Sequence, residues 1–246
     1  MGELNMKAIN LKCEYLINPI GIDIQNPRLM WNCDGGIKQT AYRIVAKSDE
    51  KTVWDSGKVV SSSMYAEYPH KLKSRERVEW TVTLRDENDL EGEPSEPAFF
   101  ETGLLSASDF TAKWISGNYR ANKKKRYPVY CFKKQFAAQN IAKARLYITA
   151  CGLYEAIING RRVGNFVLAP GHTDYTKRIQ LQTYDVTDLL SDGGNEITVE
   201  LADGWYRGSC GAWGLKNQYG TQTKLYAQLE ITDKTGKVTI VGTDKT

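Results

Sequence analysis

The regular patterns of this 246-residue chain are almost entirely strand-like, with apolar and polar residues alternating in short segments and no sustained helical period. In the stretch "VEWTVTLRD", Val78, Trp80, Val82 and Leu84 fall on one face, and Glu79 begins the polar face. Successive side chains of a β-strand point to opposite sides, so this pattern predicts a half-buried antiparallel strand.

Further segments carry the same signal. Residues 41–47, 195–201 and 224–242 alternate in the same way, the last with a turn in its middle. Asn159-Gly160 predicts a hairpin, because both residues tolerate the positive φ of a type I′ turn. The stretch "YDVTDLLSDGGN" (184–195) is the one place where a short helix is expected, since capping residues precede Leu-Leu and a Gly-Gly stop follows. The predicted fold class is therefore all-β.

The chain is predicted to hold two antiparallel β-sandwiches. A strand ends at Glu101-Thr102-Gly103, a Ser-rich link follows, and a new strand begins near Trp114. We place the first domain at 1–104 and the second at 105–246, which is long enough for two cores. Because the chain stops directly after a strand, the second domain is expected to be truncated at its C-terminal end. Three tryptophans are expected in the first core or at its edges: Trp31, Trp54 and Trp80.

Composition argues against several classes of function. The net charge is only +4, and the basic cluster at 121–128 lacks interleaved aromatic residues, so it predicts a solvated loop and no nucleic-acid partner. No phosphate-binding glycine loop is present. No apolar run approaches 18 residues, so no membrane span is predicted, and the first ten residues lack the pattern of a signal peptide. The cellular compartment is left unknown.

The cysteines predict neither a disulfide framework nor a zinc site, because their number is odd and their spacing wide. They are Cys13, Cys33, Cys131, Cys151 and Cys210. The first four lie in or beside apolar runs, so buried thiols are expected. The two histidines, His70 and His172, are far apart in sequence, and nothing in the sequence places one beside a thiol.

The stretch "LADGWYRGSCGAWG" (201–214) sets large side chains between glycines, which predicts loop geometry. In a functional interpretation, the loop faces a sugar with Asp203, Trp205, Tyr206 and Arg207. An aromatic plane covers the apolar ring face, and Asp or Arg forms hydrogen bonds with the hydroxyls. In the structural interpretation, the aromatic rings close the end of the sandwich or pack against another domain.

The stretch "PGHTDYTKR" (170–178) is the second candidate. Asp174 can accept hydrogen bonds from sugar hydroxyls, Tyr175 can stack, and the basic pair that follows can donate. The alternative is a plain turn, with Asp174 accepting backbone N–H groups. Arg161-Arg162 is better explained as the exposed tip of a hairpin than as a site.

These segments together resemble the front end of bacterial α-L-rhamnosidases of glycoside hydrolase family 78. The first domain is similar to their fibronectin-III-like domain, through "NPIGIDIQNPRLMW", "QTAYRIVAKS", "VWDSGKV" and "VEWTVTLRDENDLEGEPSEPAFFETGL". The second resembles their jelly-roll, galactose-binding-like sandwich, through "ITACGLYEAIINGRRVGNFVLAPGHTDYTKRIQLQTYDVTDLL" and "GNEITVELADGWYRGSCG". Part of the second domain is also similar to the front of family 2 β-galactosidase-type enzymes.

The resemblance implies an accessory region rather than an active enzyme. Family members carry their two catalytic carboxylates on a downstream (α/α)6 barrel, and this chain has no helical pattern for such a barrel. We therefore expect no catalytic residue here and an inactive chain. The implied partners are a rhamnose-containing glycoside and the catalytic domain of the same polypeptide. The expected substrate-binding residues are Asp174, Tyr175, Asp203, Trp205 and Tyr206.

Two alternatives stay open. Both sandwiches could serve only to brace the catalytic barrel, or the chain could be the front of a family 2 enzyme. Some relatives bind rhamnose with calcium, but no compact cluster of Asp, Asn and Glu supplies six oxygen ligands here. We therefore predict no metal and no cofactor.

Overall fold

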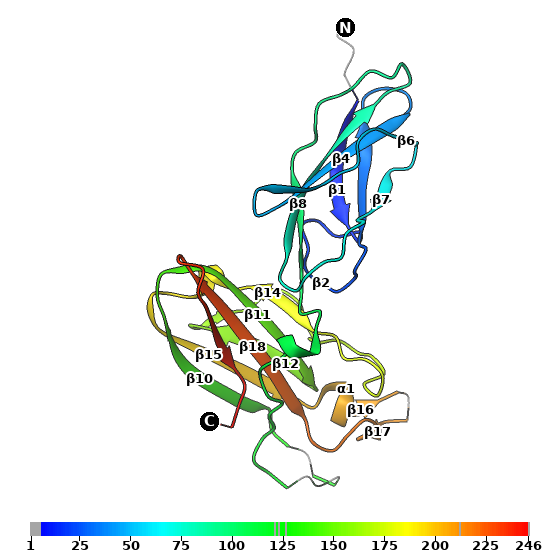
Figure 1. The fold of residues 1–246 in the computed structure, drawn as a ribbon. Helices are drawn as coiled ribbons and strands as arrows, with labels where there is room; N and C mark the ends of the chain where they lie inside the picture. The colour runs from blue at the N-terminus through cyan, green and yellow to red at the C-terminus, as the bar shows by residue number, and fades with distance from the viewer. Residues whose placement is uncertain (1–5, 121, 123, 126, 212, 246) are drawn as a thin grey trace. The chain divides into compact units, whose positions relative to one another are not determined.

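The computed structural model describes residues 6–120, 122, 124–125, 127–211 and 213–245. The predicted basic cluster at 121–128 lies partly outside these residues. The chain divides into two compact units, Met1–Asp109 and Phe110–Thr246. The regular secondary structure of each is almost wholly β-strand (Figure 1). The predicted all-β class is confirmed.

Unit 1 contains two sheets. Its strands are β1 (Lys7–Cys13), β2 (Ile20–Ile22), β3 (Arg28–Asp34), β4 (Ala41–Ser48), β5 (Lys51–Asp55), β6 (Val59–Val60), β7 (Tyr65–Glu67), β8 (Arg77–Arg85) and β9 (Ala98–Thr102). One sheet has the order β1-β3-β7, and the other has the order β2-β9-β8-β4-β5 with β6 paired to β4. The described pairings in this unit are antiparallel except for β2 with β9.

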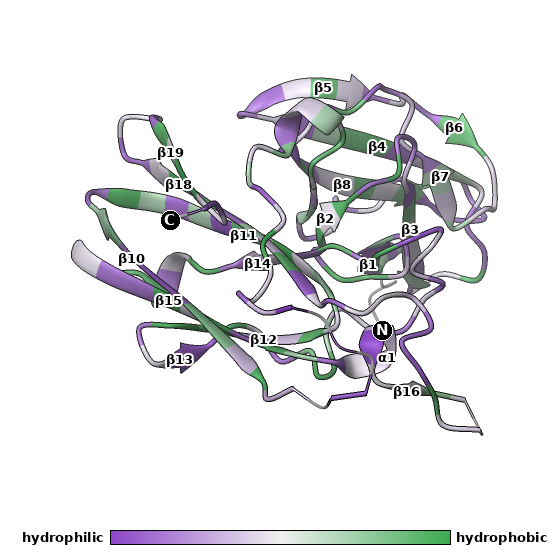
Figure 2. Cartoon of the chain, turned by 90° about the horizontal axis from the view of Figure 1, so that it is seen from below, coloured by the Kyte–Doolittle hydropathy of each residue, from purple (hydrophilic) through white to green (hydrophobic). Residues whose placement is uncertain are grey.

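The predicted alternation forms the core of unit 1. Val78, Trp80, Val82 and Leu84 on β8 are all buried, and they join β1, β3 and β4 side chains in one apolar cluster. Figure 2 shows apolar and polar residues interleaved along the strands of both units. Of the three tryptophans expected in this domain, Trp31 and Trp80 are buried and Trp54 is half-buried.

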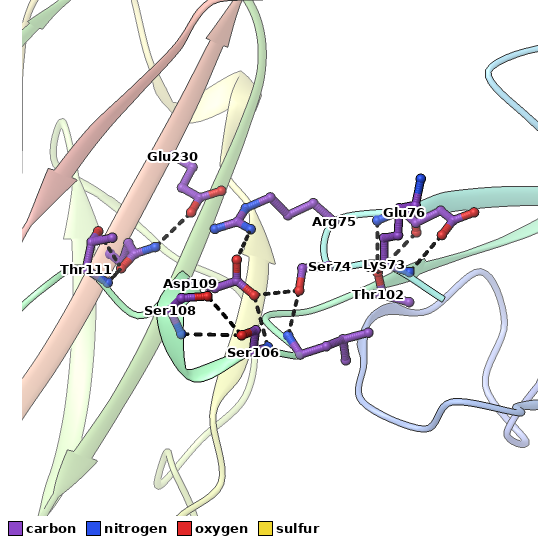
Figure 3. A network of polar contacts seen from close by, with 12 residues as sticks. Lys73, Ser74, Arg75, Glu76, Thr102, Ser106, Ser108, Asp109, Thr111 and Glu230 are labelled. Carbon is purple, nitrogen blue, oxygen red and sulfur yellow. Dashed lines mark hydrogen bonds and ion pairs between the residues drawn. The ribbon is translucent and has the colours of Figure 1, made fainter. Parts of the chain in front are cut away.

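A polar network fixes the end of unit 1. The 3-10 helix η1 (Ala107–Asp109) closes the unit. Asp109 accepts a hydrogen bond of 2.6 Å from the Ser74 hydroxyl and forms a 2.8 Å ion pair with Arg75 (Figure 3). Thr102 Oγ1 donates to the Lys73 carbonyl at 2.5 Å. These contacts join residues 73–75, which precede β8, to the last residue of β9 and to η1.

Unit 2 is a second sandwich of two four-stranded sheets. Its strands are β10 (Tyr130–Ala138), β11 (Ile141–Cys151), β12 (Leu153–Ile158), β13 (Arg161–Arg162), β14 (Gln182–Asp185), β15 (Gly193–Ala202), β16 (Ser209–Cys210), β17 (Leu215–Lys216), β18 (Lys224–Asp233) and β19 (Val238–Gly242). The sheets have the orders β10-β15-β12-β13 and β14-β11-β18-β19, and β16 pairs separately with β17. Every described pairing is antiparallel.

The two sheets of unit 2 enclose a core of their own. Ile197, Val199 and Leu201 on β15 face inward as predicted, against Leu146 and Ile148 of β11. Thr111, which is labelled in Figure 3, lies at the start of the unit. Its backbone N–H donates a 2.8 Å hydrogen bond to Oε1 of the buried Gln228 on β18.

Local predictions meet mixed outcomes. The Asn159-Gly160 hairpin is confirmed, with positive φ at both residues and β12 paired to β13 across it. Arg161 and Arg162 are exposed at its tip. The short helix expected within 184–195 forms only as a single 3-10 turn, η2 (Thr187–Leu189). Gly193 and Gly194 lie beyond it, as the predicted stop requires, and begin strand β15, which pairs with β10.

The prediction of four buried cysteines is wrong for Cys131, which is exposed. Strand β10 turns Tyr130 and Phe132 toward the core of unit 2, and the period of two places Cys131 on the opposite face. Cys13 and Cys151 are buried and Cys33 is half-buried. Among the residues that the structure describes, no helix has the length and apolar character needed to cross a membrane.

Candidate functional site

Both candidate stretches meet at one end of unit 2. The helical turn α1 (Gly204–Arg207) follows β15, and the segment 164–180 connects β13 to β14. Figure 1 shows α1 and the hairpin β16–β17 at this end, beside the yellow-green segment after β13. Ring contacts join the two stretches directly: His172 with Trp205, and Tyr175 with Tyr206. We call this region the loop end of unit 2.

Trp205 on α1 contacts a histidine of the second candidate stretch. Its indole is half-buried and stacks on the exposed His172 ring, with centroids 5.3 Å apart and an interplanar angle of 27°. Cys210 Sγ lies 3.8 Å from His172 Nε2. Sequence reasoning missed this grouping, because His172 and Cys210 are 38 residues apart and only the fold brings them together.

The two tyrosines pack inward rather than outward. Tyr175 is buried, and its hydroxyl donates to the Gly171 carbonyl at 2.9 Å. Its ring meets the Tyr206 ring edge-on at 5.4 Å and lies 5.1 Å from the Tyr219 ring. Burial raises the pKa of Tyr175 to about 12, so it stays neutral at physiological pH. The buried Tyr175 ring therefore contacts α1 through Tyr206 and also contacts Tyr219.

Two glycines near α1 allow close approaches that a side chain would block. Gly204 has φ +52°, and a Cβ there would lie 2.5 Å from Leu153 Cγ. A Cβ on Gly220 would lie 2.4 Å from the Tyr206 hydroxyl oxygen. Large rings can therefore sit on this backbone because glycine lets the chain pass close beside them.

Asp203 is engaged by a neighbour. Its carboxylate accepts from Arg207 Nε at 2.8 Å and also from Arg207 Nη2. The Arg207 side chain is only 4% exposed, against 34% for Asp203. The guanidinium also donates to the Tyr119 hydroxyl and lies over the Tyr127 ring, 4.6 Å from its centroid. This pair anchors the chain before β10 to α1.

Asp174 remains at the surface. Its Oδ1 accepts from the Thr176 hydroxyl at 2.6 Å and from the Thr176 backbone N–H at 3.1 Å, and Lys177 lies 3.4 Å from Oδ2. The hydrogen bonds from Thr176 lower the pKa of Asp174. An exposed, ionised carboxylate therefore lies one residue from the buried Tyr175.

Large apolar residues are exposed in the same loops. Phe166, Val167 and Leu168 are consecutive and each is about half exposed or more, and Trp213 beyond β16 is 89% exposed. Leu168 has φ +57°, a conformation that is unusual for a bulky residue. Within the described residues, no three or more His, Cys, Asp or Glu side chains group in a way that could hold a metal ion.

Family models match both units. Residues 139–246 match the α-L-rhamnosidase N-terminal domain, and residues 8–106 match the Rha78A-like N-terminal immunoglobulin domain. Immunoglobulin and fibronectin-III domains share the sandwich architecture, so the second match agrees with the predicted fold.

The relatives described next match nearly the whole chain, and each is named an α-L-rhamnosidase. An α-L-rhamnosidase of Formosa agariphila is 38% identical over 92% of this chain, which spans 27% of that protein. One of an Alteromonas species is 34% identical over 98% of this chain, which spans 28% of that protein. The crystal structure of the Aspergillus terreus α-L-rhamnosidase superposes with a TM-score of 0.89 and 32% identity, covering 97% of this chain and 29% of that one. The chain thus spans less than a third of these relatives and belongs to the α-L-rhamnosidase family, as its N-terminal region.

Proposed function

We propose that this chain is a non-catalytic accessory region of an α-L-rhamnosidase, and that the loop end of unit 2 contacts carbohydrate. The observation that carries the proposal is the half-exposed indole of Trp205, held by the His172 ring at 5.3 Å. An aromatic plane fixed at a surface suits the apolar C–H face of a pyranose.

Asp174 supplies the polar half of the proposed contact. Its ionised carboxylate is exposed, and charge-assisted hydrogen bonds from sugar hydroxyls are stronger than neutral ones. In this proposal Tyr175 and Tyr206 pack against each other and fix the position of α1. Asp203 forms an ion pair with Arg207 and does not contact the sugar. The contact residues that remain at the surface are therefore Trp205 and Asp174.

Rhamnose-containing glycosides are the proposed ligand class. The relatives are named α-L-rhamnosidases, and their reaction needs two carboxylates held across the glycosidic bond. L-rhamnose is a 6-deoxy sugar, so it presents a methyl group as well as an apolar ring face. Phe166, Val167 and Leu168, exposed on the segment that also carries Asp174, offer apolar surface for such a group.

The test is a titration of the whole chain followed by tryptophan fluorescence. L-rhamnose is compared with D-galactose, each with and without calcium. We expect a saturable change with rhamnose at millimolar concentrations, the range of a weak single-site contact worth about 4 kcal/mol. Trp205→Ala should abolish the change, and Asp174→Asn should weaken it. Trp54→Phe in unit 1 serves as the control that retains it.

A flat response from the folded wild-type chain, or an unchanged response in Trp205→Ala, would overturn the carbohydrate contact. If the response required calcium, the proposed contact would need a bound cation, for which the described residues offer no group of three or more His, Cys, Asp or Glu side chains. Release of p-nitrophenol from p-nitrophenyl α-L-rhamnoside by this chain would contradict the non-catalytic assignment.

A second candidate function is bracing of a catalytic domain by the same end of unit 2. The observation that favours it is the exposed apolar run Phe166–Leu168 together with Trp213. Apolar surface of this kind commonly marks a protein contact. Bracing predicts self-association of this chain, measurable by sedimentation velocity. The association should weaken in a Val167→Ser, Trp213→Ser variant, whereas a monomeric wild-type chain at high concentration would argue against it.

A further inference from the structure

The five cysteines differ in how accessible their thiols are. Cys13, Cys33 and Cys151 are buried or half-buried, and burial raises the pKa of each, that of Cys13 to about 12. Cys33 also donates to Gln39 Oε1 at 3.4 Å. Because the thiolate is the nucleophile, these three side chains are protected from reaction in the folded protein.

Cys131 and Cys210 remain, and their surroundings are different. Cys131 is exposed on β10, and no hydrogen-bond partner for its thiol lies among the described residues. Cys210 is half-buried on β16, with Sγ 3.8 Å from Nε2 of His172. The chain therefore provides a half-buried thiol beside a base, Cys210, and a more exposed thiol, Cys131, for comparison.

The imidazole at Cys210 is held in place. His172 stacks on the Trp205 indole with an interplanar angle of 27°, so its ring plane is fixed while Nε2 points to the sulfur. A nucleophile within hydrogen-bond reach of a base, with that base oriented by a third group, is the arrangement that activates Ser and Cys side chains. Here the three groups are Cys210, His172 and Trp205.

We propose that Cys210 is a reactive thiol that forms mixed disulfides with small anionic disulfides, with His172 as the proton acceptor. In this step Cys210 Sγ attacks one sulfur of the disulfide R–S–S–R and its proton passes to His172 Nε2. The new bond is Cys210 S–S–R, and the bond that breaks is the S–S bond of the reagent. The departing R–S⁻ takes the proton from His172 and leaves as R–SH, so the disulfide is the only oxidant required.

The charge around the thiol favours an anionic reagent. Lys177 and Arg178 are exposed on the segment that carries His172, and Lys216 is exposed on β17, opposite Ser209. The exposed carboxylate of that segment, Asp174, pairs with Lys177 at 3.4 Å, so exposed cations exceed exposed carboxylates by two on these two segments. Opposite charge raises the local concentration of a reagent at a surface and speeds its encounter. Glutathione disulfide carries net negative charge and is the probe chosen for the test.

The experiment measures the rate at which glutathione disulfide modifies each cysteine of the whole chain, by peptide mass spectrometry after quenching with acid. An ordinary thiol is only a few per cent ionised at pH 7, so assistance by a base gives a clear gain. We expect Cys210 to react about fivefold or more faster than Cys131. His172→Asn should reduce the Cys210 rate about fivefold and leave the Cys131 rate unchanged.

Equal rates at Cys210 and Cys131 in the wild-type chain would overturn the proposal, whatever the variants do. An undiminished Cys210 rate in folded His172→Asn would refute the role of the imidazole. If that variant fails to fold by circular dichroism, His172→Gln replaces it, and the wild-type rate ratio still decides whether Cys210 is selectively reactive. Replacing the probe with the neutral reagent iodoacetamide should reduce the preference for Cys210 but keep its dependence on His172.

One consequence rests on the proposed carbohydrate contact. A glutathione adduct on Cys210 would lie beside the His172 ring that holds Trp205, so modified protein should show a weaker fluorescence response to L-rhamnose. The labelling rates do not depend on sugar binding. A selective Cys210 with no rhamnose response would therefore uphold the reactive thiol and reject only the sugar contact.

Discussion

Removing the Asp203 carboxylate should destabilise unit 2 rather than affect only a ligand. Asp203→Ala leaves Nε and Nη2 of Arg207 without their acceptor, in a side chain that is 4% exposed. Breaking a fully buried ion pair costs about 3–5 kcal/mol. The Asp203 side is 34% exposed, so water can reach the vacated space and the cost falls to about 2–3 kcal/mol.

The assay is calorimetric unfolding of the whole chain, with the transition of unit 2 followed. A loss of about 2–3 kcal/mol corresponds to a fall in Tm of about 10 °C for a unit of this size. Asp174→Ala is the matched control, because that carboxylate is exposed and bonds only a local turn; its Tm should fall by no more than about 3 °C.

A double-mutant cycle tests the reasoning directly. Arg207→Leu removes the guanidinium, and the double variant removes both charges, so the combined loss should be smaller than the sum of the single losses by about 2 kcal/mol. Strictly additive losses, or an Asp203→Ala chain that melts within about 2 °C of the wild type, would refute the assignment of Asp203 to an anchoring ion pair.

Two further predictions concern unit 1. Hydrogen bonding to Arg43 lowers the pKa of Asp55 to about 2, so its stabilising effect is complete above its unfolded pKa of about 3.9 and is lost as the pH falls toward 2. Thermal unfolding between pH 5 and 2 should show this loss, and an equal loss in Asp55→Asn would contradict it. Trp31→Phe removes a 2.9 Å hydrogen bond to the buried Gln39, whereas Trp80 Nε1 has no partner among the described residues. Urea unfolding should therefore show Trp31→Phe to be costlier than Trp80→Phe by about 1 kcal/mol, and the reverse order would exclude this account.

The comparison of prediction and structure separates local from long-range information. The period of two along β8 and β15 and the Asn159-Gly160 turn were readable in the sequence, because each depends on neighbouring residues alone. Within 184–195, the local signal indicated a short helix and a Gly-Gly stop, and one 3-10 turn forms there. The pairing of Gly193 and Gly194 with β10 was not readable, because it depends on residues far away in the chain.

By itself, the sequence determined the all-β class, several of the strands and the family, since side-chain alternation and the order of motifs are properties of the linear chain. The strand expected near Trp114 was wrong: Ile115 forms only an isolated bridge with Leu225, and the next strand begins at Tyr130. Only the tertiary structure decided which candidates face solvent. It turned Tyr175 inward, closed Asp203 against Arg207, exposed Cys131 and brought Cys210 within 3.8 Å of His172. Alternation reveals that two faces exist but not what covers each face, and contacts between residues tens of positions apart form only when the two sheets of unit 2 close on one core.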